Sequence, residues 1–357
     1  MATADDSMEY TERLASILQA RNSLSADMRI KVEARAKDMI QHLTTDAGEI
    51  LHTLDVDKHS EDEVKTLITQ FPSALSHLHG YRLGDERIEL LPIQGAMSLS
   101  RLNGGRSSIP FIPLLAEERD KYDIGGEGQR GGLLAEDPRG GRTVLKNLAI
   151  INCCDSVCLD VLKRLRQSNL LKKEDIRQYD LLWSSCIPEG TERFEYLVDW
   201  DPKALKECQY QGNPLLHRVI VAWGSNIDSS FTLMLKAGLK HYPEELGFLF
   251  QKNGIGETAF QLAFDEFGKA KTLSAIEKCL EENTNVKLVE RNPVANLYPF
   301  MLAAAGETSD LNTVNYLLRR DPEVLYRANQ VVDTLDCVER KRKLSSGNQP
   351  HCVTAKR

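Results

Sequence analysis

The sequence predicts an all-α fold in which pairs of helices repeat along the chain and stack as a solenoid. Four short peptides that each follow a helical run of apolar residues and close on Leu indicate repeating helix ends; they occupy residues 71–75, 201–205, 242–246 and 321–325. The prolines at positions 202 and 243 are 41 residues apart, and the 79 residues from 243 to 322 are close to two such steps. A period of about 40 residues is typical of stacked helical repeats.

The composition fits a folded protein with many small helix contacts. The chain has 357 residues, of which 41% are hydrophobic and 6% are aromatic. This length is enough for two ordinary domains or for one array. The formal charge of −7 argues against nucleic-acid binding by the folded body, because phosphate binding requires clustered lysine and arginine.

Residues 1–54 are predicted to form a helical cap at one end of the stack. Two apolar stripes at the three-and-four spacing of amphipathic helices support this prediction; the first contains Leu14, Ile17 and Leu18, and the second contains Val32, Ala36, Met39, Ile40 and Leu43. Such helices have one apolar face to cover, and the first repeat of an array offers the complementary face.

The N-terminus carries acidic residues and no apolar core segment, so we expect no secretory signal. Since the chain has no run of about 20 apolar residues, we also expect no membrane span. These features predict an intracellular protein, cytoplasmic or nuclear. Its eight cysteines are then expected to be reduced thiols, because disulfides are rare in reducing compartments.

Residues 55–327 are predicted to form the repeat array. The first helix of each unit opens on a head in which small and polar residues precede an inward apolar position, occupied in six heads by Ile93, Leu145, Leu182, Leu216, Phe260 and Phe300. The separations between these positions are 52, 37, 34, 44 and 40 residues. A second amphipathic helix follows most heads. Because one such pair cannot bury its own apolar stripe, neighbouring pairs must cover it.

The heads resemble the Gly-x-Thr-Pro-Leu-His-x-Ala opening of ankyrin repeats, whose units are nearer 33 residues long. Four segments further resemble an expanded, uncharacterised diatom-type family of proteins with divergent ankyrin repeats; they are residues 108–118, 125–134, 193–202 and 317–322. This resemblance spans residues 60–327 and implies a fold and a binding role, with no known chemistry. Since no head keeps the Thr-Pro pair and only residues 212–217 keep the histidine, some units are expected to be plain helical hairpins without β-hairpin tips.

A glycine-rich insertion at residues 125–132 has two interpretations. Gly126, Gly128 and Gly131 match the letters of a dinucleotide-binding fingerprint, and the alternative function is therefore a nucleotide-binding enzyme that uses this loop. That chemistry requires a buried strand before the loop, whereas residues 117–123 are highly charged. Five glycines without an apolar anchor instead favour a mobile loop that is dispensable for folding.

No group of side chains predicts a catalytic, cofactor-binding or metal site. Cys153, Cys154 and Cys158 are close in sequence, but they lack the paired Cys-x-x-Cys spacing and the fourth ligand of a zinc site, so buried packing is favoured. Cys186 and His217 have the chemistry of a nucleophile and a base. Structural roles are favoured for both, because nothing marks an orienting acid or an oxyanion hole. The protein is therefore predicted not to be an enzyme.

The remaining histidines and tryptophans give weaker signals. His77 and His79 show no ligand spacing. Trp183, Trp200 and Trp223 are predicted to be packing residues, although an exposed tryptophan would suit the anchor of a protein interface.

Residues 328–357 lose the apolar periodicity and are predicted to be a largely disordered basic tail. The tail contains the basic run Arg340, Lys341, Arg342 and Lys343. Two interpretations stay open for this run, namely a nuclear-localisation signal for an import receptor and a solvated stretch of charge.

The sequence as a whole predicts a scaffold or protein–protein interaction module. Solenoids bind macromolecules because each unit adds a few contacts to one continuous surface. We expect a protein partner to bind the concave solenoid face and the loop tips, without covalent chemistry. A purely structural spacer is the third candidate.

Overall fold

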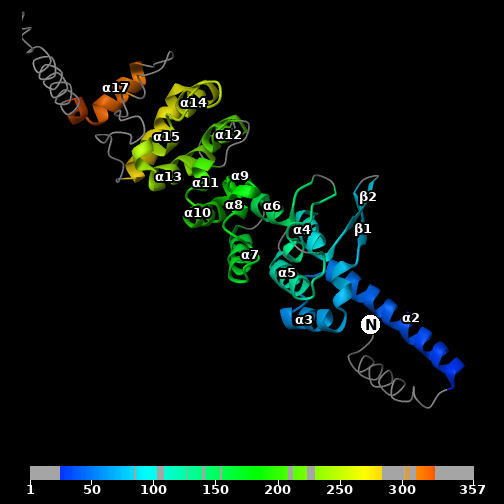
Figure 1. Ribbon diagram of the computed structural model, residues 1–357. Coiled ribbons are helices and arrows are strands. Elements are labelled where there is room, and N and C mark those ends of the chain that lie inside the picture. The colour runs from blue at the N-terminus through cyan, green and yellow to red at the C-terminus, as the bar shows by residue number, and fades with distance from the viewer. Residues whose placement is uncertain are drawn as a thin grey trace, which may run out of the picture. The chain divides into compact units, whose positions relative to one another are not determined.

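The computed structural model describes residues 25–83, 86–102, 108–126, 128–138, 141–152, 155–207, 212–222, 230–283, 301, 304 and 311–325. Most of these residues are helical (Figure 1), and the described strands form one two-stranded antiparallel sheet. The predicted all-α class is therefore confirmed, with a small β element added. The chain divides into two compact units, Met1–Ser185 and Cys186–Arg357. Within the described ranges, every helix is too short or too polar to cross a membrane.

The first unit begins with the long helix α2 (Ala26–His52), whose last turns pack on the elements that follow. Ala47, Leu51 and His52 are buried there, and α2 contacts α3, η2, β1 and α4. The elements after α2 are α3 (Glu61–Gln70), the 3₁₀ turn η2 (Pro72–Ser76), β1 (His79–Leu83), β2 (Glu86–Leu90), α4 (Pro92–Leu102), η3 (Ile109–Phe111), α5 (Ile112–Lys121), η4 (Arg130–Gly132), α6 (Val144–Ile150), α7 (Asp155–Gln167), α8 (Asp175–Gln178) and α9 (Leu181–Ser185).

Two rows of helices build the core of the first unit. The first helices of successive pairs contact one another, α4 with α6 and α6 with α9, and the second helices α5 and α7 also touch. The predicted inward positions Ile93, Leu145 and Leu182 are each fully buried. The spacing of apolar residues therefore located the core correctly in this unit.

The second unit repeats this arrangement with α10 (Thr191–Trp200), α11 (Ala204–Glu207), α12 (Leu215–Ala222), α13 (Thr232–His241), the 3₁₀ turn η7 (Pro243–Phe248), α14 (Ala259–Phe267), α15 (Lys269–Glu282) and α17 (Leu311–Arg320), preceded by the 3₁₀ turn η5 (Pro188–Gly190). First helices α12 and α14 touch, and second helices α10, α13 and α15 touch in this order. Leu216 and Phe260, the predicted inward residues, are buried. Phe300 lies outside the described residues.

The proline peptides end helices with one shared geometry. In three of them the residue before the proline has φ between −138° and −130° and ψ between 59° and 77°, and these residues are Phe71, Asp201 and Tyr242. This conformation follows because proline disfavours the α region for the residue that precedes it. The closing leucines Leu75, Leu205 and Leu246 are buried, whereas Leu325 of the fourth peptide is 44% exposed.

Short β connections precede three first helices. The β1–β2 hairpin pairs His79 with Leu90 directly before α4, and isolated bridges join Glu136 to Thr143 before α6 and Lys252 to Thr258 before α14. Thr143 and Thr258 then cap their helices by accepting hydrogen bonds from backbone amides. These units therefore have β-type tips, and are not the plain helical hairpins expected for part of the array.

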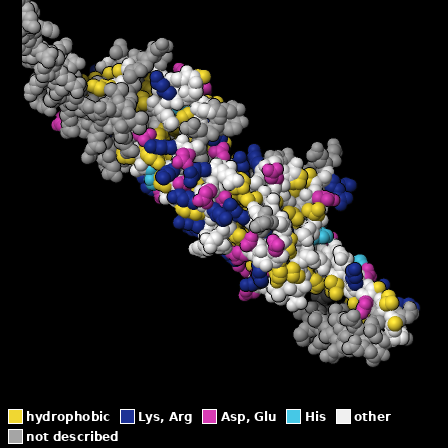
Figure 2. Space-filling view, in the orientation of Figure 1, with side chains coloured by type: hydrophobic (Ala, Val, Ile, Leu, Met, Phe, Trp, Pro, Cys, Tyr) yellow, Lys and Arg dark blue, Asp and Glu magenta, His cyan; other side chains and the backbone are white. Residues whose placement is uncertain are grey.

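Charged side chains of both signs are interspersed on the face of the molecule shown in Figure 2. On that face, the described residues form no continuous basic surface of the kind that tracks a nucleic-acid backbone. This distribution agrees with the net charge of −7.

Candidate functional site

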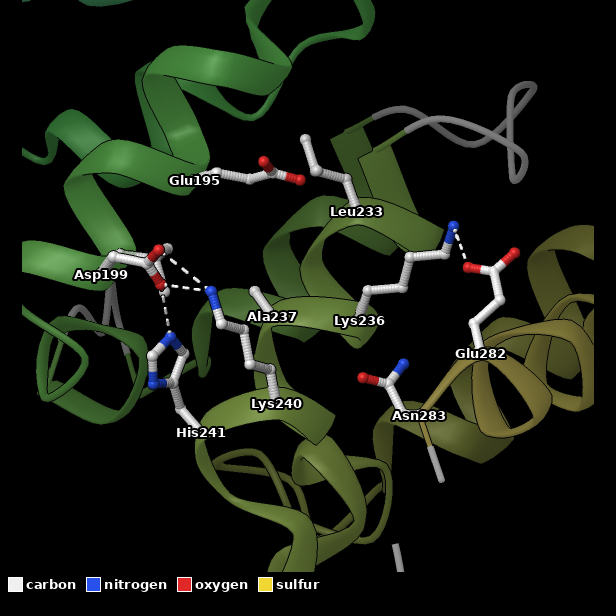
Figure 3. A pocket seen from close by; sticks show the side chains of 10 residues that line it. Glu195, Asp199, Leu233, Lys236, Ala237, Lys240, His241, Glu282 and Asn283 are labelled. Carbon is white, nitrogen blue, oxygen red and sulfur yellow. Dashed lines mark hydrogen bonds and ion pairs between the residues drawn. The ribbon is translucent and has the colours of Figure 1, made fainter. Parts of the chain in front are cut away.

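A groove of about 230 Å³ crosses the second-helix row of the second unit (Figure 3). Its apolar floor consists of Val198, Leu233 and Ala237, all buried. Its polar lining comes from α10, α13 and the end of α15, and comprises Glu195, Asp199, Lys236, Lys240, His241, Glu282 and Asn283. The groove is therefore a charged surface feature above a tightly packed helix contact.

Ion pairs cross the groove from α13 in both directions (Figure 3). Lys240 Nζ lies 2.7 Å and 3.0 Å from the two carboxylate oxygens of Asp199, and His241 Nε2 lies 2.9 Å from Asp199 Oδ1. On the other side, Lys236 Nζ lies 2.6 Å from Glu282 Oε2. The second helices of three successive pairs are thus joined by charge as well as by apolar contact.

These ion pairs favour the charged forms of Asp199, Lys236 and Glu282. Partial burial alone would raise the pKa of the Asp199 carboxyl, but hydrogen bonds from Lys240 and His241 outweigh burial and bring the pKa below its ordinary value. The bond between Lys236 and Glu282 raises the pKa of the lysine and lowers that of the carboxyl. Because a general acid or base must change its protonation state near the working pH, these ion pairs suit electrostatic contact better than proton transfer.

A second exposed feature lies on the first-helix side of the same unit, in the loop of residues 252–258, called here the isoleucine tip. Asn253 organises this loop with four hydrogen bonds to backbone groups. Its backbone amide donates to the Glu257 carbonyl at 2.9 Å, and its own carbonyl accepts from Gly256 at 3.0 Å. Its side-chain oxygen accepts from the amides of Ile255 at 3.1 Å and Glu257 at 3.0 Å. The loop is therefore ordered by its own backbone and one asparagine.

The isoleucine tip presents one large apolar side chain to solvent. Ile255 is 85% exposed, the highest exposure among the described large hydrophobic residues. The base of the loop is supported by Phe260, whose ring centroid lies 5.6 Å from that of Phe250 and 4.3 Å from that of Phe264. An exposed isoleucine on a supported loop has the geometry of an interface anchor.

The end of the glycine-rich insertion, residues 130–132, is packed and so differs from the predicted mobile loop, whereas Gly125, Gly126 and Gly128 are exposed. Gly131 and Gly132 are buried in η4, which packs on α5. Gly131 has φ 62°, and a Cβ there would overlap the carbonyl group of Ala116. Arg130 donates to the carboxylate of Asp175, which is fully buried. The sequence prediction, which relied on the five glycines and the lack of an apolar side chain, missed this packing. The segment is held instead by the Arg130 cation and by backbone contacts.

The insertion also lacks the context of a dinucleotide-binding fingerprint. The element that precedes it is helix α5, and Gly131 lies within the 3₁₀ turn η4, after which the next helix is α6. The fingerprint requires a strand before the glycines and a helix N-terminus after them. Helix α5 therefore occupies the position at which a dinucleotide-binding site would have a buried strand.

The cysteines and the histidine of the sequence analysis have separate structural partners. Cys158 is fully buried in α7, as predicted; Cys153 and Cys154 lie outside the described residues. Burial raises the pKa of the Cys186 thiol, which donates to the carbonyl of Ser230. In the described parts of the chain, no cluster of three or more His, Cys, Asp or Glu side chains is placed to hold a metal ion.

His217 links consecutive helix pairs. Its Nε2 lies 3.0 Å from the carbonyl oxygen of Glu257, in the tip before the next first helix. Gln94 occupies the matching head position and donates to the carbonyl of Glu136 at 2.8 Å. Burial is the main cause that lowers the pKa of His217, so the neutral ring donates this bond. These two side chains tie one head to the next tip, which supports the predicted structural role of His217.

The tryptophans and the basic run divide between described and undescribed residues. Trp183 and Trp200 are half-buried, and the Trp200 ring lies 6.3 Å from that of Tyr196. Trp223 and the run of Arg340, Lys341, Arg342 and Lys343 lie outside the described residues, as does the tail of residues 328–357. The nuclear-localisation prediction therefore remains a prediction.

Sequence reasoning did not single out the groove residues or Ile255. One signal was present for the groove, because Asp199 and Lys240 are 41 residues apart, the same separation as the prolines at 202 and 243. Opposite charges at the repeat spacing indicate a bond between neighbouring second helices. For Ile255 the signal was an isolated apolar residue between Gly254 and Gly256.

Comparison of the chain with protein-family models, with curated proteins and with solved structures gives no match.

Proposed function

We propose that this protein is a non-enzymatic repeat module that recognises a protein partner through its tips and first-helix row. The observation that carries the proposal is the isoleucine tip, in which Ile255 is 85% exposed on a loop that Asn253 orders. A preordered anchor binds at a reduced entropic cost. Anchors of this kind contribute most of the free energy of an interface when they enter an apolar pocket.

An ankyrin-like array is the architecture that we propose for this module. Its support comes from the paired rows of helices in each unit, the shared geometry of the proline turns, and the links from Gln94 and His217 to the following tip. Repeats that contact only their neighbours create long surfaces suited to binding other macromolecules. The groove of α10, α13 and α15 then lies on the second-helix row and stabilises the stack.

The test is capture from native lysate by parent and variant proteins, quantified for each recovered protein. Ile255→Ser is expected to lower recovery of a stoichiometric partner at least about tenfold, since a central anchor contributes about 2 kcal/mol or more. Val56→Ser is the matched control, because Val56 is also exposed, at 43%. Equal recovery by parent and both variants would contradict the role of the tip, and no stoichiometric partner with any of them would favour the structural spacer.

The nucleotide-binding enzyme is the rival proposal. Thermal unfolding with added ATP, GTP or NAD distinguishes it, because a ligand that binds only the folded state raises the melting temperature. We expect no shift with any of the three nucleotides. A concentration-dependent rise with any of the three would support the rival instead.

The cellular compartment is proposed to be cytoplasmic or nuclear, depending on the basic run. Replacing Arg340, Lys341, Arg342 and Lys343 with alanine removes the charge that an import receptor would read. A nuclear parent fusion and a cytoplasmic variant would establish an import signal. Identical distributions would leave the run as solvated charge and favour cytoplasmic scaffolding.

A further inference from the structure

Four aromatic side chains join the end of α2 to strand β1 in the first unit. His52 closes α2, His77 lies just before β1, and His79 and Tyr81 lie on β1. The ring centroid of His52 is 6.2 Å from that of His77, 5.3 Å from that of His79 and 5.8 Å from that of Tyr81. These four residues are called here the His52 cluster. His52 itself is only 2% exposed.

Both ring nitrogens of His52 are engaged within the cluster. Nε2 lies 3.0 Å from the carbonyl oxygen of His77, and Nδ1 lies 3.0 Å from the hydroxyl of Tyr81. Because a carbonyl only accepts hydrogen bonds, Nε2 carries the hydrogen, and Nδ1 of the neutral ring then accepts from Tyr81. A proton added to Nδ1 reverses this bond, because the Tyr81 hydroxyl can then only accept from Nδ1. The Tyr81 hydroxyl must then turn toward another acceptor, such as the His52 carbonyl oxygen at 3.5 Å.

No carboxylate in the described surroundings faces His52 to stabilise a positive ring. The ionisable groups that face it are His77, before β1, and His79 and Tyr81, on β1. Turn η2 and the described side chains of α4 carry no ionisable group.

On the neighbouring α3 and β2, the described acidic side chains have other positions, and Asp62 of α3 is exposed. On α3, Glu61 pairs with Arg164 at 2.5 Å and Glu63 bonds to Ser60. On β2, Glu89 pairs in register with Gly80, so it lies on the sheet face opposite His79 and Tyr81. Protonation of His52 therefore places an uncompensated charge in a buried site.

Two glycines make room for the cluster, which indicates close packing around the rings. A Cβ at Gly95 would lie 2.7 Å from His52 Nδ1, and a Cβ at Gly48 would lie 2.5 Å from the His77 side chain. Real Cβ atoms do not approach other atoms so closely. A turned hydroxyl or a reoriented ring thus has little free space within the closed arrangement.

We propose that the His52 cluster is an acid-sensitive latch, in which protonation of His52 releases the last turn of α2 from strand β1. Burial lowers the pKa of His52 from about 6.5 to about 4, with smaller contributions from the charges of His79 and His77, and the bond to the His77 carbonyl opposes this shift. The closed latch consequently binds fewer protons than the open one. Acid favours opening, in the window from pH 6.5 down to about pH 4.

Hydrogen exchange of the full chain, corrected for the intrinsic rate at each pH, tests the latch. From these two pKa values we expect the opening equilibrium of residues 45–54 and 77–83 to rise about twentyfold between pH 7 and pH 5. Helix α10, which lies in the other unit, is expected to keep its protection. An unchanged protection of residues 45–54 in the parent would overturn the proposal.

Three variants separate the latch from a general effect of acid. His52→Gln keeps an amide donor but cannot titrate, so its protection is expected to lose the pH dependence. Tyr81→Phe removes a hydrogen bond of the closed form, which raises the opening equilibrium at every pH and so moves the opening midpoint to higher pH. His42→Gln is the matched control, because His42 lies on the same helix and is exposed.

The outcomes decide the proposal even if one variant is unstable. A pH dependence that persists in His52→Gln would contradict the latch. If that variant does not fold, the opening midpoint of Tyr81→Phe is decisive, and a midpoint equal to that of the parent would contradict the latch. Nuclear magnetic resonance titration of the His52 ring gives an independent check, with a pKa expected well below the ordinary value for histidine.

Discussion

Residues 130–132, at the end of the glycine-rich insertion, and the isoleucine tip behave in opposite ways. In the insertion at residues 125–132, Gly131 and Gly132 are buried against α5, and Arg130 pairs with the buried carboxylate of Asp175. In the isoleucine tip, nothing lies within 4 Å of a Cβ built at Gly254 or Gly256, and the loop displays Ile255 to solvent. Residues 130–132 therefore form an internal joint, whereas the isoleucine tip, like Gly126 and Gly128 earlier in the insertion, lies open to solvent.

The difference shows that glycine content alone does not decide the role of a loop. Glycine permits a positive φ and close approach of backbones, and it is the neighbouring groups that use one property or the other. Gly131 requires both a positive φ and a close approach to the Ala116 backbone. Gly256, with φ 86°, requires only the positive φ. Substitutions in the two segments should therefore differ in kind.

The largest effect is expected for Arg130→Ala. This change leaves the Asp175 carboxylate fully buried without its cation, and breaking a buried pair in this way costs about 3–5 kcal/mol. Urea unfolding monitored by circular dichroism measures the loss. Arg142→Ala, at an exposed position, is the control and should change stability by less than about 0.5 kcal/mol. A loss of stability below about 1 kcal/mol in Arg130→Ala would instead support the prediction of a mobile loop that is dispensable for folding.

A smaller effect is expected for Gly131→Ala. A left-handed conformation costs about 1–2 kcal/mol in a residue with a Cβ, and overlap with Ala116 adds about 1–3 kcal/mol of overpacking. Gly254→Ala is the matched change in the isoleucine tip, where the site is open and φ is not positive. It should be neutral or slightly stabilising. Equal losses of stability in the two variants would contradict the proposed difference between the packed segment at Gly131 and the open isoleucine tip.

Asn253→Ala is expected to cost about 1 kcal/mol, because two backbone amides of the isoleucine tip lose their side-chain acceptor. Because the loop is exposed to solvent, water molecules can accept hydrogen bonds from these amides in the variant, which limits the loss of stability. Thermal unfolding gives the stability change. Hydrogen exchange at residues 253–258 should rise more than exchange in α14, and uniform acceleration of both would show that the loop is not an independent element.

Ile255→Ser is expected to change stability least, by less than about 0.5 kcal/mol. The side chain is 85% exposed and contributes little burial to the fold. Guanidinium unfolding of parent and variant measures this. A loss above about 1 kcal/mol would mean that Ile255 is a packing residue, and the proposed recognition tip would lose its main support.

The sequence predicted the helix ends and the core better than the joints between segments. Proline at positions 72, 202 and 243 ends a helix through local backbone sterics, and Leu145 or Leu216 faces inward through local periodicity, so both are readable from neighbours in the chain. Arg130 and Asp175 are 45 residues apart, and their pairing depends on tertiary packing. Single-sequence periodicity contains no information on such a pair.

The candidate sites show the same limit. Asp199 and Lys240 lie at the repeat spacing, so an alignment of units by proline position could have paired them before the structure was known. The His52 cluster brings together residues on α2 and β1, and no spacing rule relates His52 to His79. The exposure of Ile255 likewise depends on a loop that Asn253 orders, which composition does not reveal.

Site-specific photo-crosslinking tests the central claim most directly, namely that the isoleucine tip contacts a protein partner. A photoreactive residue replaces Ile255 in one protein and Lys278, an exposed residue of α15, in another. After irradiation in native lysate, the account predicts a discrete adduct from position 255 and none from position 278. An adduct from position 278 together with none from position 255 would contradict recognition through the tip.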